Sequence, residues 1–111
     1  MSPPKEITVA EAANKLASED VQLIDVRRQE EWDGSRLDGA THIELDALTD
    51  RAGEIDKDKP VLFYCYSGVR SGMAAEAFAA SGYDAYNVTG GIKAWHQAGQ
   101  PLDPPGADIV H

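Results

Sequence analysis

One segment of this sequence, residues 65–71 with the order CYSGVRS, combines residue types that can do nucleophilic chemistry. Its cysteine, Cys65, ends an apolar run over 61–65 that predicts a buried strand, and an alanine-rich run that predicts a helix over 71–80 follows. Backbone N–H groups in the loop and in the first turn of that helix have no intrahelical acceptor, so they can point at the sulfur. Such donors favour the thiolate and lower the pKa of the cysteine, which makes it a nucleophile.

Two further residues of the loop favour an anion at this place. Gly68 can adopt a positive φ and so let the loop turn back, and Arg70 adds a permanent cation that can also grip an anionic substrate. Within residues 61–90 only Arg70, Glu76 and Asp84 carry a formal charge, although the chain has 19 acidic and 10 basic side chains. An anion site in this stretch is therefore a local exception in a protein of net charge -9.

Cys65 also has a purely structural interpretation. A free cysteine often fills space as a small hydrophobic side chain at the end of a core strand. The glycine, the arginine and the following helix start favour a reactive thiolate, whereas burial alone favours an inert side chain. On the residues themselves, both interpretations stay open.

Composition and charge limit what else the protein can be. A chain of 111 residues allows one compact domain, and its one cysteine can form neither an intramolecular disulfide nor a zinc site of two or four thiolates. The acidic balance argues against nucleic acid or an anionic membrane as the partner. No apolar run approaches the ~20 residues of a membrane span, and the first residues lack the pattern of a signal peptide, so we expect a cytoplasmic protein.

The alternation of apolar segments and turns predicts an α/β domain over residues 7–100. A capping box of Thr8 and Glu11 predicts a helix that ends near residue 17, and Asp46 is expected to cap another helix that reaches residue 52. The other expected elements are a helical turn over 29–32, helices over 71–80 and 92–97, and strands over 21–26, 41–43, 61–65 and 84–88. Such alternation indicates one mostly parallel sheet, with ligand sites beyond the carboxyl ends of its strands.

The two ends of the chain are expected to lie outside this domain. Residues 1–6 have the character of a short disordered lead. The tail over 101–111 holds three of the six prolines and is expected to be extended or mobile.

Four segments, in order along the chain, resemble the rhodanese (sulfurtransferase) family. Residues 65–71 resemble its active-site loop, and residues 23–27 followed by 30–32 resemble its first Asp-Val-Arg motif. Residues 39–43 resemble its Gly-Ala segment, and 88–95 resemble its final Gly-Gly-x-x-x-Trp motif. The resemblance covers nearly the whole domain and implies a single rhodanese-like domain, with a five-stranded mostly parallel sheet and helices on both faces.

The resemblance implies a sulfurtransferase that works in two steps. Cys65 would take the outer sulfur of a donor, thiosulfate being the first choice and mercaptopyruvate the last, and would carry it as a persulfide. An acceptor, either cyanide or a thiol, then removes the sulfur, and no cofactor or metal takes part. Because the chain has no second cysteine, the acceptor must be another molecule, a small thiol or a protein. The substrate-binding loop implied in this way consists of Tyr66, Ser67, Gly68, Val69, Arg70 and Ser71.

Two other functions share these residue types. The related dual-specificity phosphatases place one more residue between cysteine and arginine than the four of this chain, 66–69, and the tighter loop suits a sulfur atom better than a phosphate. The second alternative is a sulfur-carrying or redox-sensing module that passes its persulfide to a protein and turns over small donors slowly.

The remaining candidates are expected to have structural roles. Asp25 and Arg27 lie two positions apart at a strand end, and in the family pattern they support the loops beside the site. The side chains of Tyr66 and Ser67 are expected to select the donor. Arg36 stands where many family members have histidine, and we expect it to be a solvated surface charge.

The large aromatic and histidine side chains give weaker signals. Trp95 and Phe78 are expected in the core, whereas Trp32 could border the mouth of the site. The histidines are single residues without the spacing of metal ligands, so we expect structural or surface positions for them. They are His42, His96 and His111.

Overall fold

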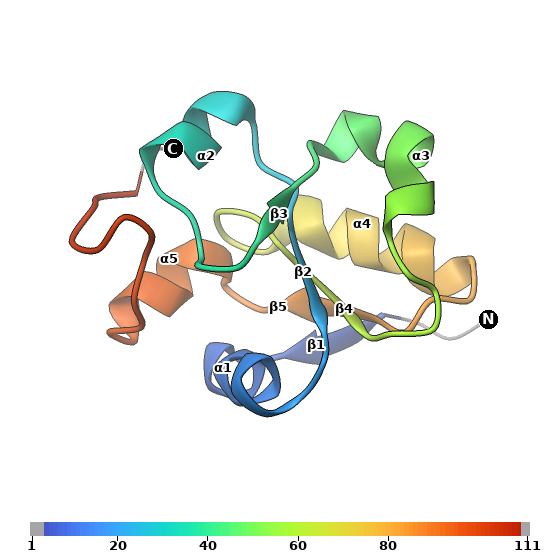
Figure 1. Cartoon of the computed structure of the whole chain (residues 1–111), viewed down its shortest axis with the longest axis horizontal. Coiled ribbons are helices and arrows are strands. Elements are labelled where there is room, and N and C mark those ends of the chain that lie inside the picture. Colours follow the sequence, from blue (N-terminus) through green and yellow to red (C-terminus); the bar gives the residue numbers. More distant parts are fainter. Residues whose placement is uncertain (1–3, 110–111) are drawn as a thin grey trace.

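The computed structural model describes residues 4–109, and its centre is one five-stranded sheet (Figure 1). The strands are β1 (Lys5–Ile7), β2 (Gln22–Asp25), β3 (Thr41–His42), β4 (Val61–Tyr64) and β5 (Ala85–Val88). Their order in the sheet is β1-β5-β4-β2-β3, and every neighbouring pair is parallel. The predicted α/β architecture with a five-stranded parallel sheet is therefore confirmed.

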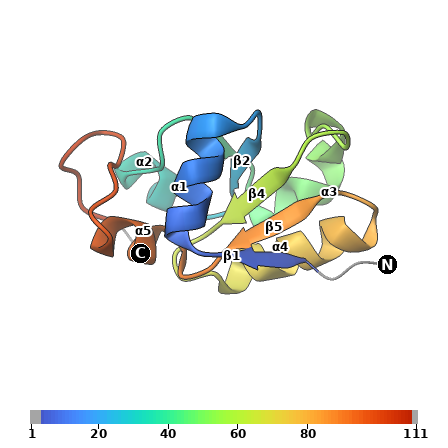
Figure 2. The same cartoon turned by 90° about the horizontal axis from the view of Figure 1, so that it is seen from below.

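Helices cover both faces of the sheet, and Figure 2 shows α1 on one side and α4 on the other. The α-helices are α1 (Val9–Ser18), α2 (Gln29–Gly34), α3 (Leu48–Arg51), α4 (Val69–Ala80) and α5 (Gly91–Gln97), and short 3-10 turns η1 (Leu45–Ala47) and η2 (Ala52–Glu54) flank α3. None of the helices within residues 4–109 is both long enough and apolar enough to cross a membrane.

The central strand β4 is buried on both faces, as its apolar sequence predicted. Val61, Phe63 and Cys65 pack in one core cluster with side chains of α3 and α4. Leu62 and Tyr64 point the other way and pack in a second cluster with side chains of α1 and α5. The alternation fixes the orientation of the strand and places the cysteine on the α4 side.

The expectation that residues 1–6 form a disordered lead is wrong for Lys5 and Glu6, which the structure describes. Lys5 and Glu6 belong to strand β1, which pairs with β5, so these residues are not a disordered lead. The Lys5 ammonium pairs with Asp84 at 2.8 Å, and the Glu6 carboxylate accepts a hydrogen bond from the Thr89 hydroxyl at 2.9 Å. These partners lie about 80 positions along the chain, which is why a local pattern gave no sign of the strand.

The helix boundaries follow the sequence with two corrections. The Thr8 and Glu11 capping box is present, with both hydrogen bonds made. Asp46 caps no helix, because the chain enters α3 through the 3-10 turn η1 and no side chain bonds to the first turn. Helix α4 begins at Val69, two residues earlier than expected, so its first turn overlaps the predicted loop.

The C-terminal segment over 101–109 packs on the domain, although it was expected to be extended or mobile. Arg36 and Asp103 form an antiparallel bridge with backbone hydrogen bonds of 2.9 and 2.8 Å, and the Ser35 hydroxyl donates to the carbonyl of Asp108. Leu102 is buried in the cluster beneath α5. In Figure 1 this segment, drawn in red, passes from α5 to α2. His111 lies outside the described residues, and the domain boundary at residue 100 stays a prediction.

Packing of the C-terminal segment predicts a loss of stability in Leu102→Ala. The substitution should lower the free energy of unfolding by about 2–3 kcal/mol, because it removes buried methyl groups and leaves a cavity. Met73→Ala is the control at a side chain that is 60% exposed, and it should change this free energy by less than about 0.5 kcal/mol. Chemical denaturation followed by circular dichroism measures both. Equal values would show that the segment is not part of the core.

The start of α5 holds the chain that follows β4. The N–H of Ile92 donates to the carbonyl of Cys65 at 2.9 Å, and the N–H of Lys93 donates to the carbonyl of Tyr66 at 3.0 Å. Gly91 has φ +59°, and a Cβ added there would overlap both of these carbonyl oxygens. Glycine is therefore required at this position for its conformation and for the close approach of two backbones.

Gly91→Ala should be strongly destabilising for this reason. We expect a loss of about 3 kcal/mol or more in the free energy of unfolding, from the positive φ and the overlap together. Gly99→Ala is a matched control, because Gly99 has φ +79° with open space around its Cβ direction, and only the conformational cost of about 1 kcal/mol applies. Thermal or chemical unfolding of the two variants compares them, and a similar loss in both would contradict the close approach.

Candidate active site

Cys65 lies at the carboxyl end of β4, where the sheet meets the start of α4. Gly68 has φ +102°, the positive value predicted for it, and it is the N-cap residue that turns the chain into α4. The side chain of Cys65 is 1% exposed, so the loop closes over the sulfur. The backbone N–H of Gly68 donates to Sγ at 3.1 Å, and the hydroxyl oxygen of Ser71 lies 3.3 Å from Sγ.

The surroundings of the sulfur favour its charged form. Burial acts to raise the pKa of the Cys65 thiol, but hydrogen bonds from the hydroxyl and N–H of Ser71 and from the N–H groups of Gly68 and Ser67 outweigh it. The net result is a pKa below the ordinary value of a cysteine. Fixed dipoles of the loop and of the first turn of α4 therefore stabilise the thiolate.

Asn87 on β5 organises the polar groups behind the sulfur. Its amide nitrogen donates to the carbonyl of Gly68 at 3.1 Å and to the Glu6 carboxylate at 3.0 Å, which turns its oxygen toward Ser71. That oxygen accepts from the Ser71 hydroxyl at 2.6 Å. The hydroxyl has one hydrogen, so Asn87 competes with the Cys65 sulfur for it and tunes how strongly Ser71 stabilises the thiolate.

Arg70 is already engaged in an ion pair. Its guanidinium donates to both carboxylate oxygens of Glu31 on α2, at 2.7 and 3.0 Å. Burial acts to raise the pKa of Glu31, but the hydrogen bonds from Arg70 and from the N–H of Arg28 hold it below its usual value. The cation expected to grip a substrate thus comes to the site as half of a neutral pair, and its contact with an anionic substrate stays a prediction.

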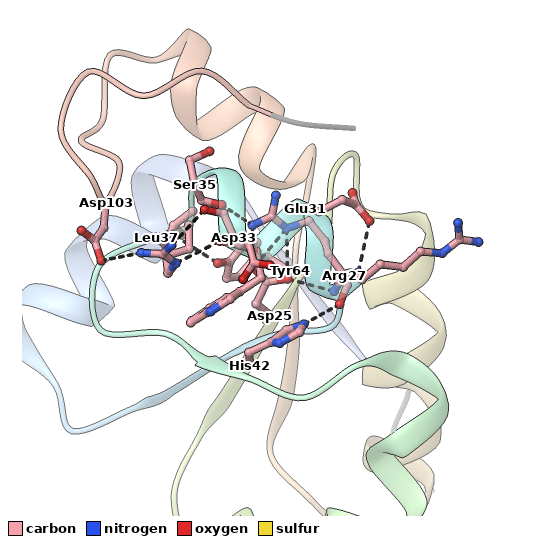
Figure 3. A network of polar contacts seen from close by, with 12 residues as sticks. Asp25, Arg27, Glu31, Asp33, Ser35, Leu37, His42, Tyr64 and Asp103 are labelled. Atoms are coloured by element: carbon pink, nitrogen blue, oxygen red, sulfur yellow. Dashed lines mark hydrogen bonds and ion pairs between the residues drawn. The ribbon is translucent and has the colours of Figure 1, made fainter.

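Figure 3 shows the polar network beneath the loop, in which Asp25 and Arg27 are central. The Arg27 guanidinium donates to both oxygens of Asp25 and to the carbonyl of Ser35, at distances of 2.6 to 3.0 Å. Both side chains are fully buried, so neither can contact a solute outside. Tyr64 accepts at its hydroxyl from the N–H of Leu37 at 3.1 Å, and burial raises its pKa. The network ties the end of β2 and the strand before Cys65 to the segment after α2.

Arg36 is not the solvated charge that we expected. Its guanidinium lies 5.0 Å from the ring of Trp32, donates to the carbonyl of that residue and pairs with Asp103 at 3.1 Å. Trp32 in turn stacks on His42, whose ring nitrogen makes a 2.6 Å hydrogen bond with the carbonyl of Arg27. Arg36 therefore fastens the C-terminal segment to α2. No sequence pattern indicated this contact, because Asp103 lies on a segment that was expected to be outside the domain.

The other residues considered in the sequence lie as follows. Trp95 and Phe78 are buried in the core, which confirms that prediction, and His96 is exposed on α5. Within residues 4–109 no group of three or more His, Cys, Asp or Glu side chains could hold a metal ion. In the loop, Tyr66 is half-buried with Lys93 5.8 Å from its ring, Ser67 is exposed and Val69 is 71% exposed.

Sequence reasoning missed three residues that hold the loop. Glu31 and Gly91 stood in two of the resembling motifs without an assigned contact, and Asn87 appeared only as a residue of the strand over 84–88. The isolated positive charge of Arg70 could have signalled a carboxylate partner such as Glu31. The adjacent glycines at 90 and 91 could have signalled a close approach at Gly91. Nothing in the local pattern signals Asn87.

The sequence of this protein is similar to that of known proteins of one family. The sequence model of the family described as Rhodanese-like domain matches residues 8–98. The uncharacterized protein YqhL of Bacillus subtilis is 42% identical over 89 residues, which are 79% of this chain and 71% of that protein. The thiosulfate sulfurtransferase GlpE of Actinobacillus succinogenes is 36% identical over 99 residues, which are 88% of this chain and 89% of that protein.

A solved structure agrees with these sequence matches. The crystal structure of a rhodanese-like domain protein from Staphylococcus aureus has a TM-score of 0.79 and 36% sequence identity, and it covers 96% of this chain and 99% of that one. The family match spans strands β2 to β5, the loop after β4 and the whole of α5. Sequence and fold together show that this protein belongs to the rhodanese-like domain family.

Proposed function

We propose that this protein is a sulfurtransferase that moves a sulfane sulfur from a donor such as thiosulfate to a thiol or cyanide. Cys65 is the nucleophile and carries the sulfur as a persulfide. The observation that carries the proposal is the contact of Sγ with the N–H of Gly68 and the hydroxyl of Ser71, because these groups stabilise a thiolate in a buried position. The names of the sulfurtransferase relatives agree with it.

The first step is a displacement at sulfur. The Cys65 thiolate attacks the outer sulfur of thiosulfate and forms a new S–S bond. The S–S bond of thiosulfate breaks, its electron pair leaves with sulfite, and the outer sulfur stays on Cys65 as an anionic persulfide. No histidine is needed to take a proton from Cys65, because the hydrogen bonds of the loop lower the pKa of its thiol and favour the thiolate.

The loop is built to hold that anion. The N–H groups that lower the pKa of Cys65 remain at the site after the sulfur is added, and no acidic side chain belongs to the loop. Only the four residues 66–69 separate Cys65 from Arg70, which favours a sulfur atom over the larger phosphate. In the second step an external acceptor attacks the outer sulfur and releases the Cys65 thiolate.

The thiolate should depend on Ser71 more than on Arg70. Ser71→Ala removes a donor near Sγ, so it should raise the pKa of Cys65 and slow its alkylation at neutral pH by up to about tenfold. The double variant Glu31→Gln, Arg70→Gln removes the neutral ion pair as a unit and should change the pKa far less. Alkylation by iodoacetamide as a function of pH measures both. A larger effect in the double variant would assign the stabilisation to the arginine.

The sulfurtransferase activity is tested with thiosulfate and cyanide. Wild type should produce thiocyanate, and mass spectrometry after thiosulfate alone should find one added sulfur on the peptide that contains Cys65. Cys65→Ala should abolish both, because the chain has no other thiol. Glu76→Gln, a change in an exposed side chain of α4, is the control for handling and folding. Equal thiocyanate production by wild type and Cys65→Ala would overturn the proposal.

A protein acceptor is the second candidate, and one observation favours it. Val69 and Met73 are 71% and 60% exposed, and they lie one helical turn apart on α4 beside the loop. They are the exposed large hydrophobic side chains of residues 4–109, a place where a partner can bury apolar surface. A stable persulfide with little turnover of small acceptors is the result expected for such a carrier.

A further inference from the structure

A cavity of about 370 Å³ lies beside the loop, and the attack of Cys65 on thiosulfate described above assigns it no part. Its wall combines two apolar side chains, Val26 and Leu45, with two arginines and three carboxylates. The volume is in the range of pockets for small organic ligands and leaves ample room for a molecule larger than thiosulfate.

The cavity adjoins the nucleophile. Arg70 is part of the wall, and it lies only five positions after Cys65 in the chain. Its guanidinium is paired with Glu31. Val26 is also part of the wall, and it packs in the same core cluster as Cys65. The hydrogen bonds with Glu31 raise the pKa of Arg70, and the attraction between its charge and the Cys65 thiolate adds to that rise. A ligand in the cavity therefore lies next to the loop that carries the sulfur.

Two charged side chains of the wall already have polar partners within the protein. Arg70 is paired with Glu31, and the carboxylate of Glu44 accepts from the N–H of Gln29 at 2.9 Å. These groups hold the wall together and need no ligand.

Three other charges of the wall are unmatched. Arg28, Glu30 and Asp46 are exposed, and within residues 4–109 their side chains form no ion pair. Around the apolar floor, the Arg28 cation and the Glu30 and Asp46 carboxylates have no partner, and Glu44 adds a third carboxylate whose charge no cation balances in the part of the chain that the structure describes. A dianion such as thiosulfate matches only the cation and is repelled by the carboxylates.

We propose that this cavity binds the sulfur acceptor, and that the acceptor is a small zwitterionic aminothiol. The ammonium group lies near Glu30 and Asp46, the carboxylate lies near Arg28, and the short carbon chain crosses Val26 and Leu45 toward the loop. This inference rests on the proposed function and adds the chemical class of the acceptor to it. Anionic donors gain nothing from the same wall.

The transfer step balances without an oxidant or a reductant. The thiol of the aminothiol gives its proton to the outer sulfur of the anionic Cys65 persulfide, and the thiolate formed in this way attacks that sulfur and forms a new S–S bond. The bond between that sulfur and Cys65 Sγ breaks, and its electron pair returns to Cys65 as the thiolate. The product is the persulfide of the aminothiol, which keeps the proton.

The test separates loading from transfer. Wild type is loaded with thiosulfate, freed of donor and mixed with one of three thiols: cysteamine, 2-mercaptoethanol or 3-mercaptopropionate. Loss of the added sulfur is followed by mass spectrometry, and each rate is divided by the concentration of thiolate and by the rate of the same thiol with a small organic disulfide. We expect cysteamine to exceed 3-mercaptopropionate by about tenfold, with 2-mercaptoethanol between them. High salt should reduce this preference.

Matched variants locate the effect in the cavity. The double variant Glu30→Gln, Asp46→Asn should reduce the cysteamine preference to about twofold or less, because the two free carboxylates are gone. Glu76→Gln, Asp58→Asn changes the net charge equally at exposed positions outside the cavity and should preserve the preference. Arg28→Gln should slow transfer to L-cysteine several-fold and leave transfer to cysteamine unchanged, because cysteamine has no carboxylate.

Each outcome decides one of the two proposals. If no persulfide forms on Cys65, the proposed function fails and the acceptor inference fails with it. If the persulfide forms but all thiols react according to their basicity, or the Glu30 and Asp46 variant behaves like its control, the acceptor inference is overturned and the sulfurtransferase stands. A cysteamine preference that only the cavity variant removes supports both.

Discussion

The site depends on the direction in which the loop after β4 turns its backbone. The carbonyls of Cys65 and Tyr66 accept from the first N–H groups of α5, at 2.9 and 3.0 Å. With its carbonyls held outward in this way, the loop can direct the N–H of Gly68 inward at the sulfur. Gly91 allows the contact because it has no Cβ. One helix start thus satisfies the loop's acceptors, and the start of α4 supplies donors to the thiolate.

Full charges near the sulfur are arranged in neutral pairs. Arg70 is balanced by Glu31, and Arg27 is balanced by Asp25 in the interior. A buried carboxylate or guanidinium without a partner would cost several kcal/mol. The anion on Cys65 is instead met by backbone and hydroxyl dipoles, which need not be neutralised when the sulfur leaves. The site can therefore hold a negative charge, on Cys65 itself or on an added sulfur, without a buried unpaired cation.

The sequence predicted those features that depend on neighbouring residues. The apolar run of β4, the capping box at Thr8 and the turn at Gly68 are local, and the structure has all three. The features that it did not predict depend on pairs far apart in the chain. Strand β1 needs β5, and the place of Arg36 needs Asp103. Local periodicity contains no information about such partners, so a chain end with several polar residues looks disordered until its partner is known.

The donor and the acceptor of a sulfurtransferase make opposite demands on the field around one thiol. An anionic donor needs positive potential at the sulfur, and in this acidic chain the loop dipoles supply it over a short range. Carboxylates in the loop would cancel that potential, whereas carboxylates such as Asp46, on the neighbouring wall, leave it intact and can attract a cationic group. In the proposed function the solitary Cys65 must pass its sulfur to another molecule. The acceptor cavity proposed above would let one sulfur atom face two substrates of different charge.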